Sequence, residues 1–463
     1  MTESKLRALA AEITKLADSF ASSLEEKNLP EASFDVDSPM SHKGITADMF
    51  MTRQTLCDKL MDMWYLVQGP SESVYNYVHN AIPDAACLNV LNHFNFWAAV
   101  PLEGSASYSE IAERVSLPVD VATRFIQHAT TLRLFEEVSS SRVKHTSRSA
   151  ALARQPGLQA LVSSVLDITG APMMAMPSAL ERFARGKSEL TQDLSETAFA
   201  LFHSTGPFGK KHTNSWEYLE NDGEGDKRGW RQAKFVEFMK YIREIFHLEG
   251  VVLDAYDWQG AGKATVVDVG GSAGHDAILL ARKYPDLQLL VQDLPMVKPV
   301  FEAEVPDDVR GRVAFVEHDM YQPQTTPADI YMLKLIFHDN SDSECVRILR
   351  ALTPGLRSGN RVVVIEYIGK VEEGESDEKK DEKEKEEEGE KEKEDEKKEP
   401  LPLSIRQMGT ATDIRMMAMF NAKERPAESY RGIFKAADER FDVVSIKADP
   451  LTFIAVIEAV WRG

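Results

Sequence analysis

Cysteine is scarce in this chain of 463 residues, which contains only three. Cys57, Cys87 and Cys345 lie far apart and show no C-x-x-C spacing. They therefore predict neither a disulfide framework nor a zinc site, and we expect no metal. Such sparse cysteine usage fits a reducing compartment, so we expect the protein to be cytoplasmic.

Long apolar runs are also missing. No uninterrupted apolar segment reaches the roughly 20 residues that a membrane-spanning helix needs. The N-terminal stretch MTESKLRALAAEITKLADSF alternates charged and apolar residues at helical spacing and has no signal-peptide core. We therefore expect a soluble, intracellular protein without a membrane partner.

Basic residues are outnumbered, with 54 Lys and Arg against 74 Asp and Glu and a net charge of -20. This balance argues against nucleic acid as a partner. Part of the excess is local, because residues 371–400 hold 17 acidic and 8 basic residues. That segment has almost no apolar residues, so we expect a solvated, disordered or loosely helical insertion rather than an interaction tail.

A glycine-rich turn between two apolar segments stands out among the residues that are present. The β-branched run Val266 to Val269 predicts a buried parallel strand, and the turn G-G-x-x-G starts at Gly270 and Gly271. A helical pattern follows, and Asp293 comes after a second strand-like run at 287–291. This βαβ unit predicts a nucleoside-bearing ligand at the strand tips, where NAD, FAD and S-adenosylmethionine fit equally well. The alternative is a turn that only packs a helix against a strand.

Two strand-like segments near the C-terminus narrow the choice. FDVVSIKA at 441–448 and LTFIAVIEAVW at 451–461 are separated only by Asp449 and Pro450. A connection this short cannot be a parallel crossover, so we expect an antiparallel hairpin that closes a mostly parallel sheet. Such an ending is typical of methyltransferases, which favours an α/β, Rossmann-like fold that binds S-adenosylmethionine.

Three further strands are predicted at 313–317, 329–334 and 361–367. They bring polar residues to the same edge of the sheet. This convergence is a stronger indication of a site than any single motif. The polar groups near these strand ends are His318, Asp319, His338, Asp339 and Glu366.

The first part of the chain is predicted to be helical, with helices at 52–67, 71–82 and 85–97, followed by a winged-helix pattern. A capping box of Ser107 and Glu110 opens a first helix, and we expect Asp120 to cap a second. The would-be recognition helix VDVATRFIQHATTL offers one arginine, which favours packing or dimerisation over DNA binding.

The next hundred residues are also mostly helical, and we expect some of them to roof a substrate site. The segment His203 to Trp216 is the favoured loop there, and we interpret His203 and His212 as ordinary loop residues. The predicted domains are a helical and winged-helix dimerisation domain at 1–150, a roof at 151–250, and a cofactor domain at 251–463 with the insertion at 371–400.

Together these features resemble the class I S-adenosylmethionine-dependent O-methyltransferases of the plant caffeate and flavonoid type and, more closely, their fungal relatives in secondary metabolism. The resemblance extends over nearly the whole chain, including FHD at 337–339 and NAKER at 421–425. It implies a homodimer formed through the N-terminal domain, a small-molecule substrate and S-adenosyl-L-methionine as cofactor. It implies cofactor-binding roles for Gly270, Gly271, Asp293, Leu294, Asp319, Met320 and Lys334.

The resemblance also implies that His338 is a general base and that Glu366 and Glu424 flank and orient it. The chemistry is sound in itself, because a histidine of pKa near ~6.5 can take the proton of a phenol of pKa near ~10 as attack begins. A carboxylate on the other ring nitrogen stabilises the imidazolium. A buried structural histidine at a strand end is the alternative interpretation of His338.

We therefore expect methyl transfer to a phenolic or enolic hydroxyl of an aromatic or polyketide-type metabolite, with the substrate and the methylated position left open. The alternative is a pericyclase or dehydratase that keeps the cofactor and polarises a carbonyl with Lys334 and His338. The family motif reads HDW or HNW, and Asn340 replaces the tryptophan here, which keeps this alternative open. A catalytically silent scaffold is disfavoured by the retained His338, Glu366 and Glu424.

Overall fold

The computed structural model describes residues 4–205, 212–223, 225, 228–245, 248–368, 401–449 and 453–463. The predicted acidic insertion at 371–400 lies outside the described residues. The chain forms two compact units. The N-terminal unit comprises Met1–Leu248 with Met417–Asn421, and the C-terminal unit comprises Glu249–Met416 with Ala422–Gly463.

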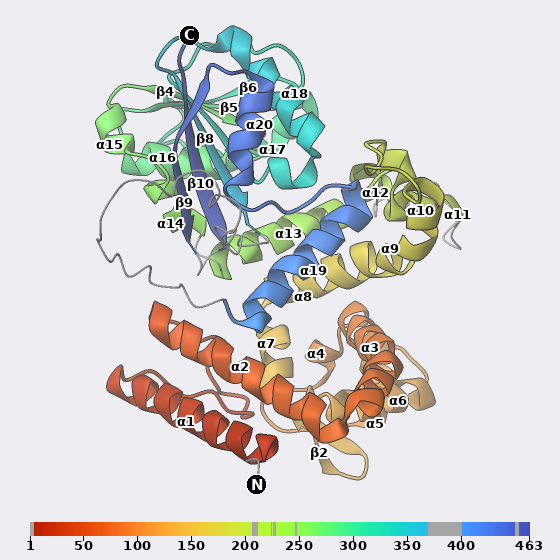
Figure 1. The fold of residues 1–463 in the computed structure, drawn as a ribbon. Coiled ribbons are helices and arrows are strands. Elements are labelled where there is room, and N and C mark those ends of the chain that lie inside the picture. The colour runs from red at the N-terminus through yellow and green to blue at the C-terminus, as the bar shows by residue number, and fades with distance from the viewer. Residues whose placement is uncertain are drawn as a thin grey trace, which may run out of the picture. The chain divides into compact units, whose positions relative to one another are not determined.

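The N-terminal unit begins with four helices (Figure 1): α1 (Lys5–Glu26), α2 (Ala47–Gln68), α3 (Pro70–His93) and α4 (Phe96–Ala99). The two separate helices predicted at 71–82 and 85–97 were wrong, because α3 continues through Pro83. Proline removes one backbone donor and disfavours a helix interior. Cys87 and Leu91 on the far side of this proline are buried in the core, which holds the helix together.

The winged-helix motif is present as predicted, with a sheet in the order β1-β3-β2. The Ser107 side chain accepts a hydrogen bond from the Glu110 N–H, and the Glu110 side chain accepts one from the Ser107 N–H. Both hydrogen bonds of the predicted capping box are therefore present. The predicted cap by Asp120 was wrong. The helix begins earlier, at Val119, and Asp120 instead pairs with Arg124 at 3.1 Å. The elements are β1 (Ala106–Ser107), α5 (Tyr108–Val115), α6 (Val119–Thr131), β2 (Phe135–Ser139) and β3 (Arg142–His145).

The rest of the N-terminal unit is helical, as expected. It includes a π-helix, η1 (Ser164–Gly170), and a 3-10 turn, η2 (Leu194–Glu196). The α-helices are α7 (Ser147–Arg154), α8 (Pro156–Ser163), α9 (Ala171–Met174), α10 (Met176–Phe183), α11 (Ala198–Thr205), α12 (Ser215–Asn221) and α13 (Trp230–Ile245).

The C-terminal unit is built on a seven-stranded sheet in the order β6-β5-β4-β7-β8-β10-β9. The first five strands in this order pair in parallel, and β10 runs antiparallel to both β8 and β9, which confirms the predicted hairpin. The strands are β4 (Thr265–Val269), β5 (Gln288–Asp293), β6 (Val313–Glu317), β7 (Ile330–Lys334), β8 (Arg361–Tyr367), β9 (Phe441–Asp449) and β10 (Ile454–Trp461).

Helices cover both faces of this sheet, with α16 on one face and α18 and α20 on the other (Figure 1). The core beneath α18 and α20 joins Tyr331, Val364 and Phe434, all of which are fully buried. The helices of this unit, of which α14 begins and α19 ends with residues of the N-terminal unit, are α14 (Leu248–Asp254), α15 (Trp258–Ala261), α16 (His275–Lys283), α17 (Lys298–Glu304), α18 (Asp342–Leu352), α19 (Leu403–Phe420) and α20 (Ser429–Ala437), with 3-10 turns η4 (Pro295–Val297), η5 (Phe337–Asp339) and η6 (Thr353–Gly355).

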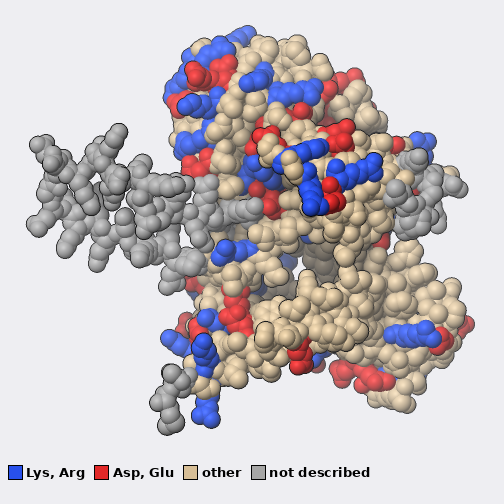
Figure 2. Space-filling model, turned by 45° about the vertical axis from the view of Figure 1, so that its right-hand side comes forward, with Lys and Arg blue, Asp and Glu red and all other residues tan. Residues whose placement is uncertain are grey.

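Within the described residues, no single helix is long and apolar enough to cross a membrane. One pair bent by 50°, Pro156–Met174 with Met176–Phe183, meets the length and composition only when its halves are combined. On the face shown in Figure 2, Lys and Arg side chains lie among Asp and Glu side chains rather than in one basic stripe. The three cysteines are free thiols, of which only Cys57 is exposed.

Candidate functional site

The glycine turn joins β4 to α16 and lies at the carboxyl end of the parallel strands. Its backbone is left-handed at Gly270, with a φ of 73°, and at Gly274, with a φ of 79°, where glycine carries no Cβ penalty. The Gly270 N–H donates to Gln292 O at 2.7 Å, which ties the turn to the neighbouring strand β5.

Close packing below the turn disfavours a side chain at either of the first two glycines, and the positive φ of Gly270 adds to this at the first. A Cβ on Gly271 would lie 2.5 Å from Asp268 Oδ2, and one on Gly270 would lie 2.6 Å from Ile336 Cδ1. The turn therefore presents only backbone next to the start of α16, a cradle in which a ligand can approach the main chain closely. These contacts suit the cofactor-binding role that the sequence implies for Gly270 and Gly271.

Asp293 ends β5 beside this turn. Its Oδ2 accepts the Ser272 N–H at 2.9 Å and its Oδ1 accepts the Leu294 N–H at 2.7 Å. Burial raises the pKa of Asp293, while these two backbone donors oppose the shift. Each carboxylate oxygen keeps a second lone pair, so the group can still accept a hydroxyl of a ribose. Leu294 is 42% exposed beside it.

A buried acidic cluster under the turn was missed in the sequence. Asp268 lies within β4, and burial together with the nearby Asp276 raises its pKa to about 8. Lys334 Nζ, at the end of β7, pairs with Asp276 Oδ2 at 2.6 Å. Asp268 Oδ2 and Asp276 Oδ1 have no hydrogen-bond partner among the described residues. An acid inside the valine run VVDV was the signal that could have identified this cluster.

Asp319 and Met320 follow β6 at the same edge of the sheet. The His318 N–H donates to Asp293 O at 3.0 Å, so the tips of β5 and β6 are joined. Asp319 Oδ1 accepts the Tyr321 N–H at 3.0 Å, and Met320 packs partly buried against the core. The structure thus brings these two residues to the edge that carries Asp293.

His338 lies in the turn η5 that follows β7, with a carboxylate near each ring nitrogen. Nδ1 is 3.4 Å from Glu424 Oε1, and Nε2 is 3.6 Å from Asp339 Oδ1. Burial opposes the charged form, but Asp339, Glu424 and then Glu366 outweigh it and raise the pKa of His338 to about 10. The imidazolium form is therefore strongly stabilised at this position.

Glu366 contacts the backbone of this turn. Its Oε1 accepts the Ile336 N–H at 2.8 Å and the Phe337 N–H at 2.5 Å, and the residue is 0% exposed. Burial raises the pKa of Glu366 to about 7, while the nearby His338 opposes that shift. Glu424 is held through its own N–H, which donates to Asp413 Oδ1 at 2.9 Å. Glu424 therefore faces the ring, and Glu366 holds the turn that carries the ring.

Asn340 occupies the position of the family's tryptophan and has a structural role here. Its side-chain amide donates to Ile336 O at 2.7 Å and accepts the Tyr321 hydroxyl at 2.6 Å. Both bonds brace the turn around His338, so Asn340 stabilises this turn through hydrogen bonds.

Ile336 connects the two halves of the site, because its side chain lies against Gly270 and its N–H donates to Glu366. The cofactor-side residues and the histidine with its carboxylates therefore form one continuous edge of the C-terminal unit. Among the described residues, no three His, Cys, Asp or Glu side chains are grouped so that they could hold a metal ion.

His203 and His212 lie in the N-terminal unit. The interpretation as a loop residue was wrong for His203, which is part of α11, whereas His212 lies outside the helices as expected. Both are buried, and their rings lie 6.0 Å apart. They pack around Tyr218 at ring distances of 4.5 Å and 5.1 Å, so the aromatic neighbours explain their burial. Burial, and then the neighbouring His212, lowers the pKa of His203 to about 4.

Comparison with known proteins identifies the family of the chain. A family model described as an O-methyltransferase domain matches residues 208–439. The O-methyltransferase lcsG of Purpureocillium lilacinum is 37% identical over 95% of this chain and 90% of its own length.

Solved structures share the fold at lower identity. The crystal structure of OxaC superposes with a TM-score of 0.71 at 19% identity, covering 98% of both chains. A structure titled as a pericyclic reaction enzyme gives a TM-score of 0.62 at 19% identity, covering 89% of this chain and 94% of that one. The family match and the lcsG identity over nearly the whole chain show that this protein belongs to the S-adenosylmethionine-dependent O-methyltransferases.

Proposed function

We propose that this enzyme methylates a phenolic or enolic hydroxyl of a small aromatic or polyketide-type metabolite, with His338 as the general base. The observation that carries the proposal is the position of His338 between the carboxylates of Glu424 and Asp339. The O-methyltransferases of fungi such as Purpureocillium lilacinum and Alternaria alternata, at 37% and 30% identity, support an oxygen acceptor.

The cofactor, when bound, supplies a methyl group that is attached to a sulfonium sulfur. When the methyl group is transferred, the rest of the cofactor is released as a neutral sulfide. We propose that the backbone of Gly270 and Gly271 holds its methionine part and that Asp293 accepts its ribose hydroxyls. Leu294, Asp319 and Met320 would lie beside its adenine. The glycine cradle and the free lone pairs of Asp293 support this assignment.

Lys334 is the remaining cofactor-side residue of this proposal. Its ammonium is paired with Asp276, so it contributes to binding as part of an ion pair. That pairing lowers its capacity to act on a substrate carbonyl as a separate donor.

The proton of the acceptor hydroxyl goes to His338. A phenol has a pKa near ~10, and the pKa of His338 is raised toward the same value. Proton transfer from the phenol to the imidazole therefore changes the free energy little. Glu424 and Asp339 stabilise the imidazolium as it forms, and Glu366 keeps the turn in place. The consequence is that only neutral His338 is active, and its fraction grows with pH.

The raised pKa of His338 also favours a second candidate function. A protonated imidazole can donate a hydrogen bond to a carbonyl oxygen and promote cyclisation without methyl transfer. A solved structure with this fold is titled as a pericyclic reaction enzyme. We retain a cofactor-bound pericyclase or dehydratase as the alternative.

Label transfer decides between these functions. The purified protein is incubated with methyl-labelled S-adenosylmethionine and a panel of phenols and enolic polyketides. Methyl transfer predicts labelled product and one S-adenosylhomocysteine per product, whereas isomerised or dehydrated product without S-adenosylhomocysteine would exclude the methyltransferase function.

We also propose that the enzyme is a homodimer through α2 and α3. These consecutive helices expose a row of large apolar side chains, and monomers rarely expose such contiguous faces. A second copy of this face would cover it. The exposed residues are Leu60, Met61, Trp64, Tyr65, Leu66, Val67, Val74, Tyr75, Tyr77, Val78 and Ile82.

Charges on this face should separate the two copies. We expect the double variant Trp64→Glu, Tyr77→Glu to halve the molar mass measured by light scattering, because four like charges would have to be buried in the interface without partners. Val119→Glu on α6 is the control, since Val119 is also an exposed apolar residue but does not belong to α2 or α3. A wild-type protein that runs as a monomer would refute the proposal.

A further inference from the structure

We propose that Arg425 is a positioning residue for methyl transfer, because its guanidinium fixes the turn that presents His338 to the substrate. This inference rests on the proposed function, in which His338 is the base. It concerns a residue of the NAKER motif for which the sequence suggested no role.

The guanidinium of Arg425 reaches both ends of the turn. Nη1 donates to Phe337 O at 2.6 Å, and Nη2 donates to Asn340 O at 2.6 Å. These two carbonyls belong to the residues directly before His338 and directly after Asp339. The backbone is therefore held on both sides of His338 and Asp339. Arg425 is only 1% exposed, so water does not compete for these bonds.

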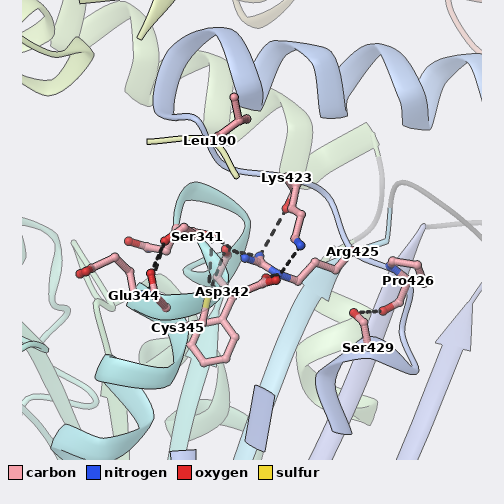
Figure 3. A network of polar contacts seen from close by, with 12 residues as sticks. Leu190, Ser341, Asp342, Glu344, Cys345, Lys423, Arg425, Pro426 and Ser429 are labelled. Atoms are coloured by element: carbon pink, nitrogen blue, oxygen red, sulfur yellow. Dashed lines mark hydrogen bonds and ion pairs between the residues drawn. The ribbon is translucent and has the colours of Figure 1, made fainter. Parts of the chain in front are cut away.

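Asp342 orients the guanidinium from the opposite side. Its Oδ1 accepts Arg425 Nε at 2.8 Å, and its Oδ2 accepts Lys423 Nζ at 2.6 Å (Figure 3). Asp342 is half exposed and begins α18, the helix that follows the turn. Three donors of one planar group thus join the turn and the helix start, a geometry that a lysine ammonium cannot reproduce.

The position of Arg425 in the chain couples this clamp to the base itself. The preceding residue, Glu424, places Oε1 3.4 Å from His338 Nδ1. One short segment therefore supplies both the carboxylate that contacts the imidazole and the guanidinium that holds its backbone. If the clamp loosens, His338 moves relative to Glu424, and the stabilisation of the imidazolium weakens.

The test is the variant Arg425→Lys in the full-length protein. Since a misplacement of about 1 Å can cost about 10²-fold in rate, we expect a smaller shift to lower the kcat of the form with neutral His338 about tenfold, with the affinity for S-adenosylmethionine unchanged. The acidic limb of the pH–rate profile should move to lower pH, because His338 loses contact with Glu424. The charged groups that face His338, namely Asp339, Glu424 and Glu366, are all retained in this variant.

Two control variants separate positioning from general stability. Arg350→Lys removes a guanidinium that holds the Ala436 and Ala437 carbonyls on the far end of α20, and we expect wild-type kcat. Lys423→Met removes only the second partner of Asp342, and we expect less than a twofold change. An equal loss of kcat in Arg350→Lys would overturn the proposal, as would wild-type kcat and pH profile in Arg425→Lys.

If Arg425→Lys does not fold, Asp342→Asn takes its place, because a half-exposed carboxylate is removed at little cost. We expect kcat to fall and the pH–rate profile to shift in the same direction as in Arg425→Lys, but by less. An unchanged kcat and an unchanged profile would overturn the proposal. The pKa of His338, followed by NMR without substrate, should fall in either variant even if the reaction is not methyl transfer. Full activity of a His338→Ala variant would instead refute the proposed function.

Discussion

We expect His338→Ala to lower kcat by about 10²- to 10⁴-fold, the contribution typical of a positioned general base. Alanine removes the imidazole that accepts the proton. The nearest carboxylates, those of Glu424 and Asp339, contact the two nitrogens of this ring in the wild-type enzyme. The affinity for S-adenosylmethionine should be unchanged, because the glycine turn and Asp293 do not touch the imidazole. Initial rates and calorimetric titration of the cofactor measure the two quantities separately.

His128→Ala is the matched control for this variant. His128 Nε2 also contacts a carboxylate, Asp84 Oδ1 at 2.9 Å, but belongs to the N-terminal unit. We expect its loss to leave kcat within twofold of wild type. More than a tenth of wild-type activity remaining in His338→Ala would show that the ring is a structural histidine and not the base.

The same histidine should govern the pH dependence of the wild-type enzyme. Because its neighbouring carboxylates raise the pKa of His338 to about 10, the neutral form is a minor species at neutral pH. The active fraction increases with pH, so kcat/KM should rise about tenfold per pH unit on the acidic side. A limb that levels off near an ordinary histidine pKa of about 6.5 would contradict this electrostatic account.

The sheet could be predicted because its signals are local. The valine run before Gly270, and the short connection between the final two strands, determine direction and pairing over short stretches of sequence. The helix through Pro83 could not be predicted, because buried Cys87 and Leu91 override the local preference of proline. The burial of His203 likewise depends on Tyr218, which lies on another helix.

The site was predicted as a set of residues but not as a network. Glu424 and His338 are 86 positions apart, and sequence alone does not state which oxygen meets which nitrogen. Resemblance named both glutamates as partners of the histidine, whereas Glu366 contacts the backbone of the turn. Asp276 and Arg425 were missed for the same reason, because their roles exist only through partners far along the chain.

The second large effect is expected from Gly271→Ala, which should weaken S-adenosylmethionine binding about 5- to 150-fold. The new methyl group would lie 2.5 Å from Asp268 Oδ2 and 3.0 Å from Val291 Cγ1, so the turn or the buried carboxylate has to move. Overpacking of this kind costs about 1–3 kcal/mol. A turn that moves to relieve this strain has to return to its original shape when the cofactor binds, so the same free energy is lost from binding, at about tenfold in affinity for each 1.4 kcal/mol. Calorimetric titration with the cofactor measures the loss.

Gly432→Ala on α20 controls for the added methyl group, because nothing lies within 4 Å of the Cβ position there. Alanine is the better helix former, so we expect unchanged cofactor affinity and a slightly higher Tm. The steric strain at Gly271 acts directly on the cradle, whereas a merely structural glycine would lower Tm and leave affinity intact. If Gly271→Ala keeps the wild-type affinity but has a lowered Tm, the turn does not belong to the cofactor site. Asp293 would then bind the cofactor without the turn.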